Sequence, residues 1–313
     1  MKTIPCLLVA GWLAFAPAVT HAKIERLVEK TFTVQPGGTL KIGTQGGNIS
    51  VRAGADNQVH LVAREKIRAD SEAEADKLLQ DLTLTMEQTG NDVEAVAKYQ
   101  KENSGWHFGS WPPVQVVFEV TVPAKYSAIL RTSGGDVQVG DLTGRVEVRT
   151  SGGDVTVGRI DGDVKVGTSG GDIQLAQATG AADLGTSGGE VTVGSVGGSA
   201  KISSSGGDLH LGPVAGALQA HTSGGDVTAE LKGPLKGDCS LGSSGGKVKV
   251  TVDRGVGFEL EAATSGGEVK APGLSITLEQ GRGSKSRLAG AVNGGGPKLR
   301  LRSSGGDIVI VTR

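Results

Sequence analysis

The sequence Ser151-Gly-Gly-Asp-Val-Thr-Val-Gly-Arg-Ile-Asp-Gly-Asp-Val-Lys-Val-Gly-Thr168 decides the fold, because it repeats along the second half of the chain. Apolar and other residues alternate in two runs, Val155 to Val157 and Val164 to Val166. Such alternation indicates a β-strand with one buried face. We expect the glycine-rich stretches between the runs to form tight corners through positive φ angles. One copy therefore predicts one coil of strand, corner, strand and corner.

The Ser-Gly-Gly motif returns at a fixed interval of 18 residues. Its serines in this part of the chain are Ser133, Ser151, Ser169, Ser187, Ser205 and Ser223. Further copies begin at Ser244, Ser265 and Ser304, and the gap of 39 residues before the last copy predicts a degenerate coil inside it. A period this short is typical of solenoids, whose coils bury their apolar faces by stacking.

The same register is found upstream, where Gln45 replaces the serine and Asn48 replaces the aspartate. The fold class is therefore all-β, a parallel β-solenoid of about eleven coils that bury small β-branched residues. Aromatic residues make up only 3% of the sequence, which disfavours a core built mainly of large rings. We expect a right-handed winding, because parallel crossovers strongly prefer that hand.

Residues 65–126 interrupt the repeat and differ from it in kind. Ser71 to Glu74 fits a capping box ahead of a short helix, and alternating runs predict strands at 82–86, 93–99 and 114–122. We expect this α+β segment to cap an end of the solenoid, since an open terminal coil exposes strand edges. The predicted organisation is a signal peptide at 1–22, N-terminal strands and a first coil at 23–64, the capping insertion at 65–126, and the repeats at 127–313.

The first 22 residues have the features of a secretory signal peptide. Lys2 precedes an apolar run from Ile4 to Phe15, and small residues surround Ala22 for cleavage. No later run approaches the roughly 20 apolar residues of a transmembrane helix, so we expect an exported protein that is periplasmic, secreted or on the cell surface. The formal net charge of −1 excludes nucleic-acid binding through bulk positive charge.

An acidic residue follows the second glycine in six successive copies. These residues are Asp136, Asp154, Asp172, Glu190, Asp208 and Asp226. Stacked coils place such carboxylates about 4.8 Å apart, where each pair repels by roughly 1 kcal/mol in water. Calcium ions bound by these carboxylates could offset the repulsion, and so could backbone N–H groups at each corner. Lys247 takes the same place in a later copy, which favours the interpretation as corner hydrogen bonds over calcium binding.

The hydroxyl pairs before the glycines, such as Thr150–Ser151 and Thr168–Ser169, also have two interpretations. A regular hydroxyl array can face ice or a sugar, but two adjacent residues cannot both project from one strand face, which favours corner hydrogen bonds. Cys239 falls in the inward column of Val164. We therefore expect a buried small apolar residue there, and not a reactive thiol.

An aromatic cluster, defined as Trp106, His107, Phe108 and Trp111, is the candidate site for binding a ligand or partner. On an exposed loop these rings could stack on sugars or anchor a protein. The alternative is a plug that covers the end of the coil stack.

These features resemble a known bacterial family. The Thr-Ser-Gly-Gly-Asp-Val-x-Val-Gly coils, the Glu119–Ala124 strand and the Gly294–Asp307 segment are similar to the bacterial "putative adhesin" domain-of-unknown-function family, which is related to the head domains of autotransporter adhesins. The resemblance implies a β-solenoid on an exported bacterial protein, and it supplies no catalytic residue and no cofactor.

The first functional hypothesis is a non-enzymatic binding or scaffold rod of the cell envelope, with a surface glycan or an envelope protein as partner. It would bind through the aromatic cluster or through a flat polar row. That row consists of Gln138, Thr156, Gln174, Thr192, His210 and Thr228. The alternatives are a periplasmic sensor or accessory protein of an envelope stress system and, more remotely, a polysaccharide-active enzyme.

Overall fold

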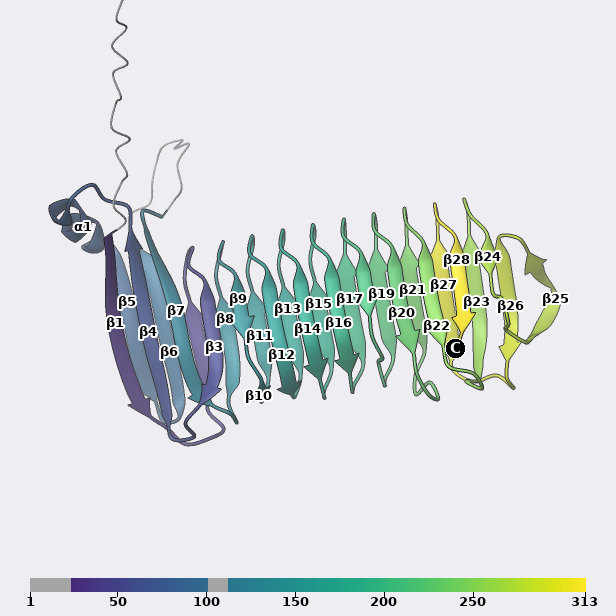
Figure 1. Ribbon diagram of the computed structural model, residues 1–313, viewed down its shortest axis with the longest axis horizontal. Coiled ribbons are helices and arrows are strands. Elements are labelled where there is room, and N and C mark those ends of the chain that lie inside the picture. Colours follow the sequence, from purple (N-terminus) through teal and green to yellow (C-terminus); the bar gives the residue numbers. More distant parts are fainter. Residues whose placement is uncertain (1–23, 101–111) are drawn as a thin grey trace, which may run out of the picture.

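The computed structural model describes residues 24–100 and 112–313, and the side chains of these residues except 278–283. Two long sheets run side by side along an elongated molecule (Figure 1). Consecutive strands of the repeats alternate between the two sheets, so the chain winds around an interior that both sheets share. The predicted β-solenoid is confirmed.

Sheet A contains one face of every coil. In spatial order its strands are β1 (Ile24–Thr33), β4 (Gln58–Ile67), β7 (Val114–Pro123), β3 (Ile49–Gly54), β9 (Val137–Val139), β12 (Val155–Asp161), β14 (Ile173–Ala178), β16 (Val191–Val196), β18 (Leu209–Leu211), β20 (Val227–Leu231), β22 (Val248–Val252), β28 (Ile308–Thr312) and β24 (Val269–Lys270), with β10 (Leu142–Thr143) paired beside β12.

Sheet B contains the other face. In the same direction its strands are β5 (Leu82–Thr89), β6 (Asp92–Tyr99), β2 (Thr39–Gly43), β8 (Ser127–Arg131), β11 (Val146–Arg149), β13 (Val164–Gly167), β15 (Ala182–Gly185), β17 (Ala200–Ser204), β19 (Leu218–Thr222), β21 (Cys239–Ser243), β27 (Lys298–Ser303), β23 (Phe258–Thr264), β26 (Arg287–Val292) and β25 (Ile276–Ser284).

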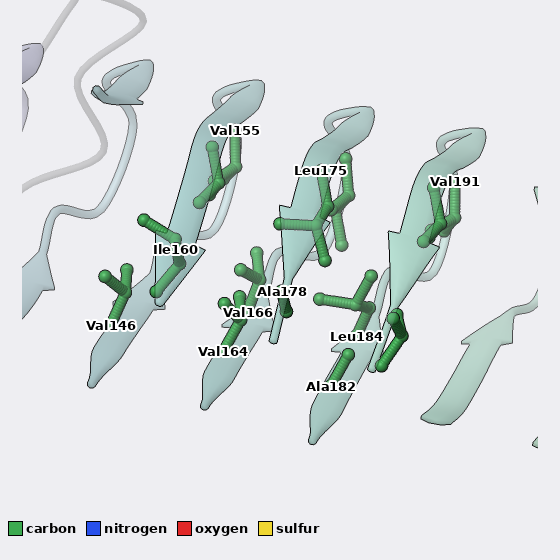
Figure 2. Packing of buried hydrophobic residues seen from close by; sticks show 14 of the residues in the cluster. Val146, Val155, Ile160, Val164, Val166, Leu175, Ala178, Ala182, Leu184 and Val191 are labelled. Carbon is green, nitrogen blue, oxygen red and sulfur yellow. The ribbon is translucent and has the colours of Figure 1, made fainter. Parts of the chain in front are cut away.

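Successive coils pair in parallel and without a shift in register. Val155 lies beside Ile173 in sheet A, and Val164 lies beside Ala182 in sheet B. Since side chains alternate between the two faces of a strand, this register stacks the apolar residues into inward columns. Figure 2 shows side chains from both sheets, Val155 and Val164 among them, gathered in this interior. Each fully buried valine or leucine contributes roughly 1.5–3 kcal/mol relative to exposure.

Positive φ angles occur as predicted at Gly144 and Gly162 in the opposite corners, but the prediction is wrong for the glycines of the Ser-Gly-Gly corners. The second glycine is required by close stacking instead. A Cβ on Gly153 would lie 2.0 Å from the carbonyl oxygen of Gly135 in the preceding coil, whereas a Cβ on Gly152 would meet nothing nearer than 3.7 Å. The sequence pattern cannot distinguish a conformational need for glycine from a need for space.

At the N-terminal end, the order of the coils departs from the order of the chain. The coil formed by β2 and β3 lies between β6 and β7 on one side and β8 and β9 on the other, in parallel throughout. Beyond it, the antiparallel strands β1, β4 and β5 end the two sheets. Helix α1 (Glu72–Leu79) has the predicted cap, because the Ser71 hydroxyl accepts the Glu74 N–H at 3.2 Å.

The C-terminal end has a similar exchange of order. The coil formed by β27 and β28 lies between the coil of β21 and β22 and the coil of β23 and β24. The prediction of a degenerate coil between Ser265 and Ser304 is therefore wrong. Those residues form the antiparallel hairpin β25–β26, which pairs with β23. The spacing gave only a number of residues, and a hairpin of similar length fits that number equally well.

Candidate functional site

A ladder of buried hydroxyls runs along the corners of the stack. The Thr168 hydroxyl donates to the carbonyl oxygen of Gly153 in the preceding coil at 3.1 Å and accepts the N–H of Gly171 in its own corner at 3.3 Å. Thr150 and Ser204 make the same two bonds in their coils. The prediction of corner hydrogen bonds is confirmed for these first hydroxyls, which are committed to the structure of the stack.

Five of the six acidic candidates, all except Glu190, form a second ladder on the outside of sheet A. The N–H of Asp154 donates to Oδ1 of Asp136 at 3.1 Å, and the N–H of Asp172 donates to Oδ1 of Asp154 at 2.8 Å. Asn48 begins the ladder, because its Oδ1 accepts the Asp136 N–H at 3.0 Å. Each of these carboxylates thus accepts a backbone N–H as predicted, but the N–H belongs to the next coil.

The longer side chain of Glu190 departs from this pattern. Its N–H donates to Oδ1 of Asp172, but its own carboxylate accepts the Thr192 hydroxyl at 2.9 Å and lies 3.5 Å from Nε2 of His210. The ladder resumes at the next corner, where Asp208 accepts the Asp226 N–H at 2.7 Å. In the part of the chain that the structure describes, no group of three or more His, Cys, Asp or Glu side chains is arranged to hold a metal ion. Calcium binding by the acidic column stays a prediction.

The predicted polar row lies on the outer face of sheet A. Its members stand directly beside one another on adjacent strands, from Gln138 beside Thr156 to His210 beside Thr228. The acidic column runs parallel to this row, two residues earlier on each coil. Members of both lines, from Asp154 to Thr192, border a shallow groove of about 270 Å³ over β12, β14 and β16.

A larger groove of about 780 Å³ continues this face toward the N-terminal end. It lies where the antiparallel strands β4 and β7 join the parallel strands β3 and β9. Its lining includes Arg52, His60, Glu119, Gln138 and Thr156. Nδ1 of His60 is 3.1 Å from the Thr31 hydroxyl, and Glu119 lies 3.6 Å from Arg64. The groove therefore offers donors and acceptors of both charge signs beside the first members of the polar row.

Comparison with protein families shows to which family the chain belongs. The family model described as Toastrack DUF4097 matches residues 38–311. The chain belongs to the Toastrack DUF4097 family. The Toastrack match begins just before β2 and ends within β28, so it includes both segments in which the order of the coils departs from the order of the chain. No curated protein matches the sequence.

Three solved structures align with more than nine tenths of this Toastrack chain, at low sequence identity. A "putative adhesin" from Bacteroides fragilis NCTC 9343 is 14% identical, with 91% of this chain and 97% of that chain covered and a TM-score of 0.40. A "putative cell adhesion protein" from Clostridium sporogenes ATCC 15579 is 15% identical, with 92% and 100% covered and a TM-score of 0.22. A "putative adhesin" from Parabacteroides distasonis ATCC 8503 is 13% identical, with 91% and 97% covered and a TM-score of 0.37.

The aromatic cluster of Trp106, His107, Phe108 and Trp111 lies outside the residues that the structure of this Toastrack protein describes. Its role in binding stays a prediction. Cys239 is placed as predicted, because it pairs beside Leu218 in an inward column and is only 2% exposed. Burial raises the pKa of its thiol, which keeps the group protonated and unreactive at neutral pH.

Two further ionisable groups of the Toastrack fold are buried near its N-terminal end, and the sequence pattern did not single them out. Burial raises the pKa of Tyr126 to about 12, and its hydroxyl donates to the carbonyl oxygen of Asn91. Burial also raises the pKa of Glu65, which faces inward on β4 beside Arg26. Across residues 24–100 and 112–313, no helix has the length and apolar character that crossing a membrane would require.

Proposed function

We propose that this protein is a non-catalytic, adhesin-like binding rod of the bacterial cell envelope, which holds a surface glycan or an envelope protein on the outer face of sheet A. The observation that carries the proposal is the in-register polar row from Gln138 to Thr228, which leads into the groove of about 780 Å³. The predicted signal peptide at 1–22 and the adhesin names of the structural relatives agree with this role.

The chemistry of the row suits an extended ligand. Each coil contributes one amide, hydroxyl or imidazole, and the next coil contributes another about 4.8 Å further along. These groups both donate and accept hydrogen bonds, as sugar hydroxyls and peptide backbones do. A single contact of this kind is weak, but contacts repeated along one rigid support add up in the way that multivalent binding requires.

A glycan array and a pull-down from envelope extract test the proposal with the purified protein. Replacing Thr156 and Gln174 together by alanine removes two adjacent members of the row, and we expect affinity for the captured ligand to fall about tenfold. Thr85→Ala is the matched control, because Thr85 is exposed on strand β5 of sheet B, away from the row. Unchanged binding by the double variant, or capture of nothing by the unaltered protein, would refute the proposal.

A further inference from the structure

A separate groove of about 660 Å³ lies on the opposite side of the molecule, outside sheet B. It crosses β17, β19, β21 and β27, four strands that are adjacent in the sheet although the last comes from a distant part of the sequence. Its lining includes Lys201, His221, Ser240, Gly242, Arg300 and Arg302. Basic and hydroxyl side chains therefore lie together on a face that neither the polar row nor the acidic column reaches.

Two of the cations in this groove, Arg302 and Lys201, form no ion pair in the described part of the chain, although the charge of Arg302 helps to lower the pKa of the nearby Glu261. Arg302 lies between Gly242 on β21 and Ala263 on β23, neither of which can neutralise it. Lys201 lies beside Asp183, but the Asp183 carboxylate is 3.4 Å from the Lys165 ammonium group instead. Arg300 differs, because it donates to Glu261 at 2.8 Å. The groove thus presents one ion-paired cation and two cations without an ion pair.

The floor of the groove is open because of Gly242. A Cβ at this position would lie 3.3 Å from Nδ1 of His221, so a side chain there would crowd the imidazole. His221 and Arg302 stand on either side of this floor, separated by two strand spacings of about 4.8 Å each. Exposed hydroxyls of Ser203, Ser240 and Ser244 surround it.

We propose that this groove binds a segment of an acidic polysaccharide, with its carboxylates on Arg302 and Lys201 and its hydroxyls on His221 and the serines. The unpartnered cations supply the charge complementarity, and their separation by more than one strand matches acidic groups that are spaced along a sugar chain. Asp238 in the lining and Glu261 beside Arg300 oppose the dense phosphates of a nucleic acid. This ligand and this face are independent of the function proposed for sheet A.

Titration calorimetry with polygalacturonate, at low and at physiological salt, tests the inference. We expect binding that weakens with salt, and no binding of neutral dextran. Arg302→Ala together with Lys201→Ala should lower the affinity about tenfold or more, because two charge-assisted hydrogen bonds are lost. The control pair Lys41→Ala and Lys125→Ala removes the same charge at exposed sites outside the groove and should leave the affinity unchanged.

Three results would overturn the inference: no binding of polygalacturonate at low salt, an equal loss in the control pair, or equally tight binding of a DNA duplex or of anionic phospholipid vesicles. Thermal melting verifies that each variant is folded. If the alanine pair does not fold, the double variant Arg302→Gln and Lys201→Gln replaces it in the binding measurement. The pair Thr156→Ala and Gln174→Ala should leave polygalacturonate binding intact. Failure of the proposal for sheet A is thereby distinguished from failure of this one.

Discussion

The second glycine of each corner lies against the carbonyl oxygen of the corner before it, and the hydroxyl three residues earlier bonds to both corners. Gly171 and Thr168 form one such pair: Thr168 donates to Gly153 O and accepts the Gly171 N–H. At the scale of the residue, the repeated sequence motif is therefore a device for joining one coil to the next. Its small side chains allow backbones to approach, and its hydroxyls satisfy the polar groups that the approach buries.

Gly153→Ala tests the role of close stacking. The added Cβ would lie 2.0 Å from the Gly135 carbonyl oxygen, so two coils must separate locally, and we expect a loss of about 3 kcal/mol in the free energy of unfolding. Urea denaturation measures it. Gly152→Ala is the control in the same corner, where we expect a change below about 1 kcal/mol. Equal losses in both variants would contradict the stacking argument.

Thr168→Val tests the hydroxyl ladder. Valine has nearly the same shape as threonine but leaves the Gly153 carbonyl and the Gly171 N–H without this partner, so we expect a loss of about 2 kcal/mol by urea denaturation. Thr168→Ser should retain most of the stability, since Ser204 fills the same position in a later coil. Thr156→Val on the outer face should change it little, and a loss there as large as at Thr168 would contradict the role of the ladder.

At the scale of the element, β4 differs from the strands of the repeats. It is antiparallel to both neighbours, and its inward side includes Glu65, only 7% exposed, in line with Leu61 and Ile67. Burial raises the pKa of this carboxyl group, and the charge of Arg26 only partly opposes the effect. The strand therefore includes one residue whose ionised form the fold disfavours.

Glu65→Gln should raise stability at neutral pH. Because the folded pKa of Glu65 lies above its unfolded value, the folded protein binds the proton more tightly, and stability falls as the pH rises from the unfolded pKa through the folded one. We expect melting temperatures of the unaltered protein and of the variant to converge at acid pH and to separate above it. Glu119→Gln, an exposed change on the neighbouring strand β7, should show no such separation. A variant that is less stable at pH 7 would contradict the argument.

The repeated elements could be predicted from the sequence because their period and alternation are local properties. Strands such as β12 and β13, the capped helix α1 and the inward position of Cys239 all follow from residues close together in the chain. Strands β1 and β4 lack that repeat, and antiparallel pairing at the ends depends on contacts far apart in sequence. Of the binding surfaces, the polar row was predictable because it has the same period, whereas the groove beside Arg302 needs a strand order that no local pattern contains.

At the scale of the whole molecule, each end of the stack contains one coil that is inserted out of chain order. The coil of β2 and β3 and the coil of β27 and β28 each have a parallel coil on both sides, although each lies near one end of the described chain (Figure 1). Leu299 and Leu301 of β27 are fully buried as a result. The strands at the actual edges are instead β1 and β5 at one end and β24 and β25 at the other.

Hydrogen exchange tests this order. We expect the amides of β27 to exchange as slowly as those of the central strand β15, because both lie inside the sheet with neighbours on each side. The amides of β25, at the edge, should exchange first among the strands near this end. Fast exchange throughout β27, like that of a fraying terminus, would contradict the inserted position.

The inserted coil of β27 and β28 also constrains how the molecule is made. Residues 258–270 are synthesised before residues 298–312, yet their final neighbour in the stack is the later segment. During translation and any passage through a membrane, residues 258–270 must therefore either stay unpaired on this side or give up an earlier pairing before residues 298–312 can pair with them. Assembly therefore cannot follow the order of synthesis coil by coil. The complete stack forms only after residues 298–312 have inserted between their two neighbouring coils.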